Sequence, residues 1–309
     1  MKRLCQGLAL AAFLGAPLVS SAQEAADERK TESQEPVVEA EVMDEEPAGP
    51  NAGKLSFSGG TDFTTAYFFR GYNQEDQGVI GQPYLTLFAK LSDSDEFKVT
   101  GYVGTWNSVH SESTLADASS GPDSWYESDF IAGVDVSSGA FTVGFIYTLY
   151  TYPNGAFESI QELGVKLAWD DSEFQKGRLG FALKPYVAAY AETGDRNGSE
   201  DWYGEAGIAP GIYTFNEDGK YPVAISVPLT VGLGLKDYYF DEGGDEEILG
   251  YASAAVTASV PLAFIPADYG SWNVTGTFQY LYLNAEGLQA ANHGDDYELI
   301  GKIGLAFAY

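Results

Sequence analysis

From Leu55 to the last residue, apolar and polar side chains alternate along the chain with a period of two. Leu55, Phe57 and Phe63 fall on one side of this pattern, and Ser56 and Asp62 fall on the other. Alternation of this kind predicts β-strands with one apolar face. We expect about twelve such segments: 55–72, 78–91, 97–110, 125–137, 140–152, 157–169, 178–193, 201–215, 222–237, 248–263, 271–284 and 297–309.

The lengths and connections of these segments favour a membrane barrel over a soluble sandwich. Soluble strands average about 5–6 residues, whereas a tilted strand needs about 9–11 residues to span a bilayer. Compact turns alternate with longer polar loops, as in barrels that have short periplasmic turns and long outer loops. The turns are 92–96, 137–139, 216–220 and 266–270, and the loops are 111–124, 194–200, 238–247 and 285–296. The pattern predicts an all-β, transmembrane, antiparallel up-and-down barrel in the bacterial outer membrane.

Aromatic residues gather near the ends of the expected segments, which predicts two interfacial girdles. The girdle near the long loops is expected to contain Tyr67, Phe69, Tyr72, Tyr150, Tyr152, Phe157, Trp202, Tyr239, Tyr282 and Tyr297. The girdle near the short turns is expected to contain Phe57, Phe97, Phe141, Trp169, Phe215, Phe264, Trp272, Phe307 and Tyr309.

The last segment predicts how the barrel closes and assembles. Hydrocarbon cannot hydrogen-bond an open sheet edge, so the final strand must pair with the first. Its apolar positions end on an aromatic residue, as in the C-terminal signal of outer-membrane assembly. We assign that signal to Ile303, Leu305, Phe307 and Tyr309.

The first 53 residues differ from the barrel in composition. Residues 1–22 combine Lys2 and Arg3, an apolar run over 8–19 and small residues at 20–22, which predicts a cleaved signal peptide. Residues 23–53 are acidic, contain three prolines and lack aromatics, which predicts a disordered periplasmic tail. The barrel domain is therefore expected over 54–309.

Several short motifs resemble the TorF (Gcw_chp-type) family of bacterial outer-membrane porins. They are the run Tyr67–Gly71, the run Gly101–Ser108, the acidic pair Glu127 and Asp129, the run Tyr150–Gly155, and Glu162. Together they cover roughly residues 57–165. The resemblance implies an outer-membrane barrel and names no solute.

The polar face of each strand should line the lumen, because a charge on the lipid face costs about 2–4 kcal/mol at the midplane. This set mixes both signs. The expected pore-lining residues are Asp62, Arg70, Lys98, Tyr102, Trp106, Glu127, Asp129, Glu162, Lys166, Arg178, Lys184, Glu205, Lys236, Glu298 and Lys302. Either they line an aqueous path or they pair and fill the barrel, since twelve strands lie between filled and open barrels.

The overall charge limits the function classes. A formal net charge of -29 excludes a nucleic-acid partner. The expected partners are outer-membrane lipid and lipopolysaccharide, the barrel-assembly machinery and small solutes. The acidic run 241–247 offers oxygen ligands but lacks the spacing of a calcium loop, and no metal or cofactor is expected.

Passive diffusion of small solutes or ions, with weak cation preference, is the expected function. A plugged barrel that acts as a structural or surface anchor is the alternative. Outer-membrane hydrolysis is a further alternative, since His110 and His293 stand near serines and aspartates: Ser111, Ser113, Asp295 and Asp296. Such neighbours occur in any polar loop, so we expect no enzyme.

Overall fold

The computed structural model describes residues 53–309 except 95, 116–120, 176, 194–199 and 218. The predicted signal peptide and nearly all of the predicted acidic tail lie outside the described residues. No helix within the described part of the chain is long and apolar enough to cross a membrane.

The chain forms an antiparallel barrel of twelve strands, as the alternating pattern predicts. Two of these strands are each divided into two parts. One consists of β10 and β11, with a break near Pro210, and the other of β12 and β13, with a break near Pro228. Proline cannot donate a hydrogen bond to the ladder. The wall strands are β1 (Leu55–Thr64), β4 (Ile80–Asp93), β5 (Lys98–His110), β6 (Trp125–Ser138), β7 (Phe141–Thr151), β8 (Ile160–Trp169), β9 (Tyr186–Thr193), β10 (Trp202–Ile208), β11 (Gly211–Phe215), β12 (Val223–Ser226), β13 (Leu229–Lys236), β14 (Leu249–Pro261), β15 (Ser271–Leu283) and β16 (Tyr297–Ala308).

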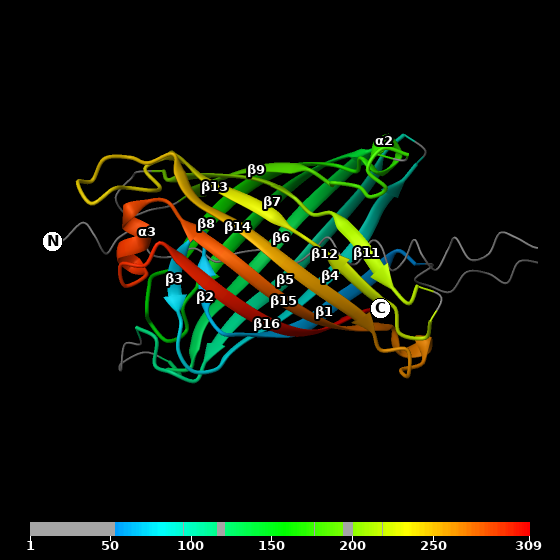
Figure 1. Cartoon of the computed structure of the whole chain (residues 1–309), viewed down its shortest axis with the longest axis horizontal. Coiled ribbons are helices and arrows are strands. Elements are labelled where there is room, and N and C mark those ends of the chain that lie inside the picture. Colours follow the sequence, from blue (N-terminus) through cyan, green and yellow to red (C-terminus); the bar gives the residue numbers. More distant parts are fainter. Residues whose placement is uncertain (1–52, 95, 116–120, 176, 194–199, 218) are drawn as a thin grey trace, which may run out of the picture.

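The last strand closes the barrel on the first, as predicted. In β1 and β16, Phe63 pairs with Ile303 and Ser58 pairs with Ala308, and β15 joins β16 to β14. The C-terminus lies with the short turns and the 3₁₀ turn η2 (Ala267–Tyr269) at one end, here called the turn end (Figure 1). The helix α3 (Glu286–Ala291) lies at the opposite end, here called the loop end.

Apolar side chains cover the outside of the wall. On β16, Ile303 is 59% exposed and Leu305 is 37% exposed, whereas Ile300 and Gly304 between the outward positions are buried. Every residue of the proposed assembly signal lies on or beside this outward face, and Tyr309 stacks on Phe57 with ring centroids 5.3 Å apart. The signal function itself stays a prediction.

The first expected segment, 55–72, is not one strand. The wall strand β1 ends at Thr64, and the chain then turns into the barrel as a separate two-stranded sheet, β2 (Tyr67–Phe69) and β3 (Tyr72–Glu75). We call β2, β3 and the turn between them the inner hairpin. The turn consists of Arg70 and Gly71, with φ of 45° and 88°, the two positive values that a type I′ turn requires. Because the alternation of β1 continues through β2, the sequence pattern did not reveal that the chain leaves the wall between them.

The expected strand 178–193 is also shorter than predicted. β9 begins at Tyr186, and the preceding connection contains the short helix α2 (Ser172–Gln175). Burial alone would raise the pKa of Asp171, but the backbone N–H groups of Lys184 and Leu183 donate to its carboxylate and lower this pKa below its usual range. The guanidinium carbon of Arg178 lies 3.9 Å from the ring centroid of Phe174. Arg178 and Lys184 therefore lie in a turn-end connection and not on a wall strand.

The two predicted aromatic girdles agree with the structure to different degrees. At the turn end most predicted members face outward, for example Phe141 and Phe215, both 53% exposed. At the loop end only some do, such as Trp202, Tyr282 and Tyr297. Others fill the barrel instead, because they belong to the inner hairpin or pack beside it. Tyr67 and Phe69 of the hairpin, and Tyr150, Tyr152 and Tyr239 beside it, are each at most 7% exposed.

Candidate functional site: the closed lumen

Burial of the lumen-facing side chains changes halfway along the strands. On β15, Leu281 and Leu283 near the loop end are buried, whereas Thr275, Thr277 and Gln279 toward the turn end are half-buried. The wall strand β6 shows the same change, from buried Glu127, Asp129 and Ile131 to half-buried residues beyond them. The lumen is therefore packed at the loop end and accessible from the turn end.

The inner hairpin causes this packing. It leaves the wall after β1, where the Thr65 N–H donates to Gly301 O at 2.9 Å, and its turn reaches the opposite wall at β8. Gly71 lies so close to Leu288 of α3 that a Cβ atom there would be 2.6 Å from Leu288 Cδ1. Glycine at this position thus serves both the turn and the contact with the loop-end helix.

An ion pair fixes the tip of the inner hairpin. Arg70 Nη1 and Nη2 donate to the two carboxylate oxygens of Glu162 on β8, at 2.7 and 3.0 Å. Tyr150 also donates to Glu162, at 3.0 Å. Arg70 is 7% exposed and Glu162 is 2% exposed. Bidentate guanidinium–carboxylate pairs are strong and geometrically specific, so this pair orients the hairpin in the lumen.

Three tyrosines complete the surroundings of Arg70. Its guanidinium carbon lies 4.1 Å from the ring centroid of Tyr203, 4.6 Å from Tyr190 and 5.8 Å from Tyr238. We call Glu162, Tyr150, Tyr190, Tyr203 and Tyr238 the guanidinium cage. Aromatic faces attract a cation through their quadrupole, so the cage stabilises Arg70 beyond the ion pair.

A second polar cluster packs on the root of the hairpin. The Tyr67 hydroxyl donates to Glu127 Oε2 at 2.9 Å, and Asp129 follows two positions later on the same face of β6. Glu127 Oε1, Asp129 Oδ1 and the Tyr152 hydroxyl are buried without a partner among the described residues. This acidic pair is packing against the hairpin rather than an exposed pore wall.

The histidines do not form a hydrolytic site open to substrate. His110 Nε2 lies 2.8 Å from Ser108 Oγ, and Nδ1 lies 2.7 Å from Thr114 Oγ1, which in turn donates to Glu75. Ser108 and His110 are 0% and 1% exposed, so a scissile bond has no access to them. His293 is instead exposed and lies 3.0 Å from Asp76. The sequence did not indicate the Ser108–His110 contact, because it depends on how the strand end packs.

The other predicted lumen residues lie at different depths. Below the hairpin is a polar cavity of about 100 Å³. Its lining includes these predicted residues: Asp62, Arg70, Trp106, Glu162, Glu205 and Lys302. Toward the turn end, Lys166 lies 4.2 Å from the ring centroid of Tyr186, and Tyr102 faces the lumen with Trp106. Three predicted residues lie at strand ends: Lys98, Lys236 and Glu298.

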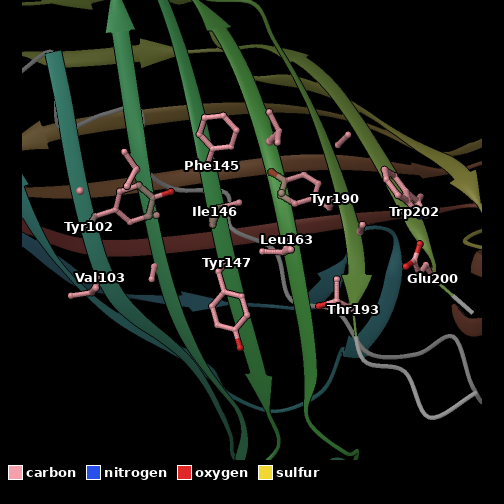
Figure 2. A pocket seen from close by; sticks show the side chains of 18 of the residues that line it. Tyr102, Val103, Phe145, Ile146, Tyr147, Leu163, Tyr190, Thr193, Glu200 and Trp202 are labelled. Carbon is pink, nitrogen blue, oxygen red and sulfur yellow. The ribbon is translucent and has the colours of Figure 1, made fainter. Parts of the chain in front are cut away.

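A second hollow, of about 1010 Å³, is lined mainly by apolar residues. It lies on the outside of the wall, over neighbouring strands that carry Val103, Phe145 and Leu163 (Figure 2). These three side chains are 45%, 53% and 53% exposed. In a membrane barrel this surface contacts lipid, so it is not a solute site.

The closed hydrogen-bond ladder and this apolar outer surface show in which environment the chain lies. In hydrocarbon every backbone group must be paired, and only a barrel without open edges allows strands to do so. Apolar residues face outward along the wall while the charged mid-strand residues face the lumen, which is the arrangement of outer-membrane barrels. The protein is an outer-membrane β-barrel.

Comparisons with solved structures find outer-membrane proteins of low similarity to this chain. An outer membrane channel from Pseudomonas putida F1 is 10% identical, with 82% of this chain and 94% of that chain covered and a TM-score of 0.44. LpxR from Salmonella typhimurium is 11% identical, with 82% and 99% covered and a TM-score of 0.39. The NanC porin is 14% identical, with 82% and 98% covered and a TM-score of 0.32.

The sequence comparisons give no family. No family model matches the chain, and no curated protein matches it. The resemblance to TorF-type porins therefore rests on the short motifs alone.

Proposed function

We propose that this barrel is a channel for small polar solutes and ions that is closed at its loop end by the inner hairpin. One observation carries the proposal: the strands β2 and β3 form a sheet of their own, apart from the wall sheet. The hairpin can therefore leave the lumen without breaking the ladder that closes the barrel. Side-chain contacts hold it in place, and such contacts can be exchanged.

The lumen chemistry supports polar cargo. Toward the turn end it presents hydroxyl, amide and charged groups of both signs, and pore selectivity follows the groups that line the path. The loop end carries an excess of acids. A field of one sign at an entrance concentrates ions of the opposite sign, so the open channel should weakly prefer cations.

Single-channel recordings on the purified, refolded protein test this function. We expect long closed periods interrupted by discrete current steps. In a salt gradient the reversal potential should show cation preference in dilute salt, which fades in concentrated salt because exposed charges are screened over about 8–10 Å. Anion preference would contradict a selective element at the acidic loop end and would place it at basic side chains of the lumen, such as Lys166 and Lys302.

A plugged barrel that anchors surface loops is the second candidate. The buried Arg70–Glu162 pair favours it, because this pair holds the hairpin firmly. A folded protein that never passes current steps would support this candidate and contradict the channel. We propose no enzymatic role, since Ser108 and His110 are enclosed.

A further inference from the structure

The guanidinium cage has the form of a ligand site that the chain fills with its own side chain. Most of it belongs to the barrel wall: Tyr150 is on β7, Glu162 on β8, Tyr190 on β9 and Tyr203 on β10. Tyr190 and Tyr203 are register partners within the ladder. These four residues therefore keep their relative positions when the inner hairpin moves.

Departure of Arg70 would leave a strong requirement for another cation. Glu162 would stay in a largely enclosed position with the Tyr150 hydroxyl as its hydrogen-bond donor on the wall. A buried carboxylate without a cationic partner is costly. The faces of Tyr190 and Tyr203 are already oriented toward the position of the guanidinium carbon, at 4.6 and 4.1 Å.

The cage is connected to the accessible part of the lumen. The polar cavity of about 100 Å³ is lined by Arg70 and by the four wall residues of the cage. A small solute that enters from the turn end can thus reach Glu162 beside the hairpin tip. Space of this size suits a guanidinium group with a short aliphatic stem.

We propose that the guanidinium cage binds small guanidinium compounds, and that Arg70 is the internal competitor that occupies the site when the channel is closed. The planar group matches Glu162 through two parallel hydrogen bonds and stacks on tyrosine rings, which a compact ammonium cannot do equally well. A bound solute replaces Arg70 and releases the inner hairpin. This release rests on the proposed channel function, whereas the binding does not.

Chemical rescue of Arg70→Ala by the guanidinium ion tests the binding. Millimolar guanidinium chloride should raise the unfolding temperature of this variant by several degrees, measured by heat-modifiable gel mobility. Sodium chloride at equal ionic strength should not do so. Wild type should show no rise, because its cage is filled. In the double variant Arg70→Ala/Glu162→Gln the rise should disappear, and a rise of equal size there would overturn the proposal.

A second measurement uses the unchanged protein, in case Arg70→Ala does not fold. Agmatine, which carries a guanidinium on a short stem, should increase the open probability of wild-type channels, and butylamine should increase it much less. If Arg70→Ala is rescued while wild type never conducts, the site stands and the channel function fails. If folded Arg70→Ala shows no rescue, the site is wrong. The site is also wrong if Arg70→Ala does not fold and agmatine leaves the open probability of wild-type channels unchanged.

Discussion

Removal of the inner hairpin should convert the barrel into a permanently conducting pore. We would replace residues 66–76 by a short Gly–Ser linker between β1 and the approach to β4. The hairpin fills the loop-end half of the lumen, and β1 pairs with β4 and β16 independently of it. At fixed voltage the resting current should rise on the order of tenfold above that of wild type, because the deletion empties the loop-end half of a lumen lined by polar groups.

A matched deletion at the same end serves as the control. Shortening the loop tip at 241–245 removes acidic residues but leaves the hairpin and the cage intact. That variant should keep the resting current of wild type. Heat-modifiable mobility must show a folded barrel in both variants. A folded hairpin deletion that still does not conduct would mean that other loop-end segments close the lumen.

Substitution of Glu162 by Gln should release the hairpin without removing it. Gln cannot neutralise Arg70, so the closed state would contain an unpaired buried guanidinium. Breaking such a pair costs about 3–5 kcal/mol, and each 1.4 kcal/mol is about tenfold in an equilibrium. The ratio of open to closed time should therefore rise about a hundredfold or more, as measured by single-channel recording.

Two further variants separate the loss of the ion pair from the loss of any lumen carboxylate. Glu298→Gln removes a lumen-facing carboxylate of β16 whose described hydrogen bond is to the neighbouring Leu299 N–H, and it should gate like wild type. Arg70→Met/Glu162→Gln replaces the ion pair by groups of similar volume, which is often neutral for stability. It should return the open probability toward wild type. Wild-type gating in Glu162→Gln would show that the ion pair does not hold the hairpin.

The barrel wall was predictable because its physics is local and repetitive. Period-two alternation, turn residues and the need for closure place the wall strands and pair β16 with β1. The interrupted strands near Pro210 and Pro228 stay within their expected segments. The turn-end connection was misplaced because alternation continues past Gly177 and Gly180, although both have φ of 77° and mark turns.

The inner hairpin could have been found from two signals. The expected segment 55–72 is much longer than a spanning strand requires. Within it, Arg70–Gly71 stands between apolar residues on both faces, as in a two-residue hairpin turn. These two signals could not identify Glu162 as the partner of Arg70. Arg70 and Glu162 are 92 positions apart, and only the path of the hairpin across the lumen brings them together.

A reversible cross-link between hairpin and wall is the most direct test of the central claim that hairpin movement opens the channel. A Cβ atom at Gly71 would lie 3.4 Å from Tyr251 Cβ, close to the separation in disulfides. We would introduce Gly71→Cys and Tyr251→Cys in a chain with Cys5→Ser and with Leu288→Ala, which removes the side-chain atom 2.6 Å from the new Cβ. Single channels would be recorded before and after reduction. The oxidised protein should show no current steps, and reduction should restore them. Equal opening of the oxidised and reduced protein would contradict the account.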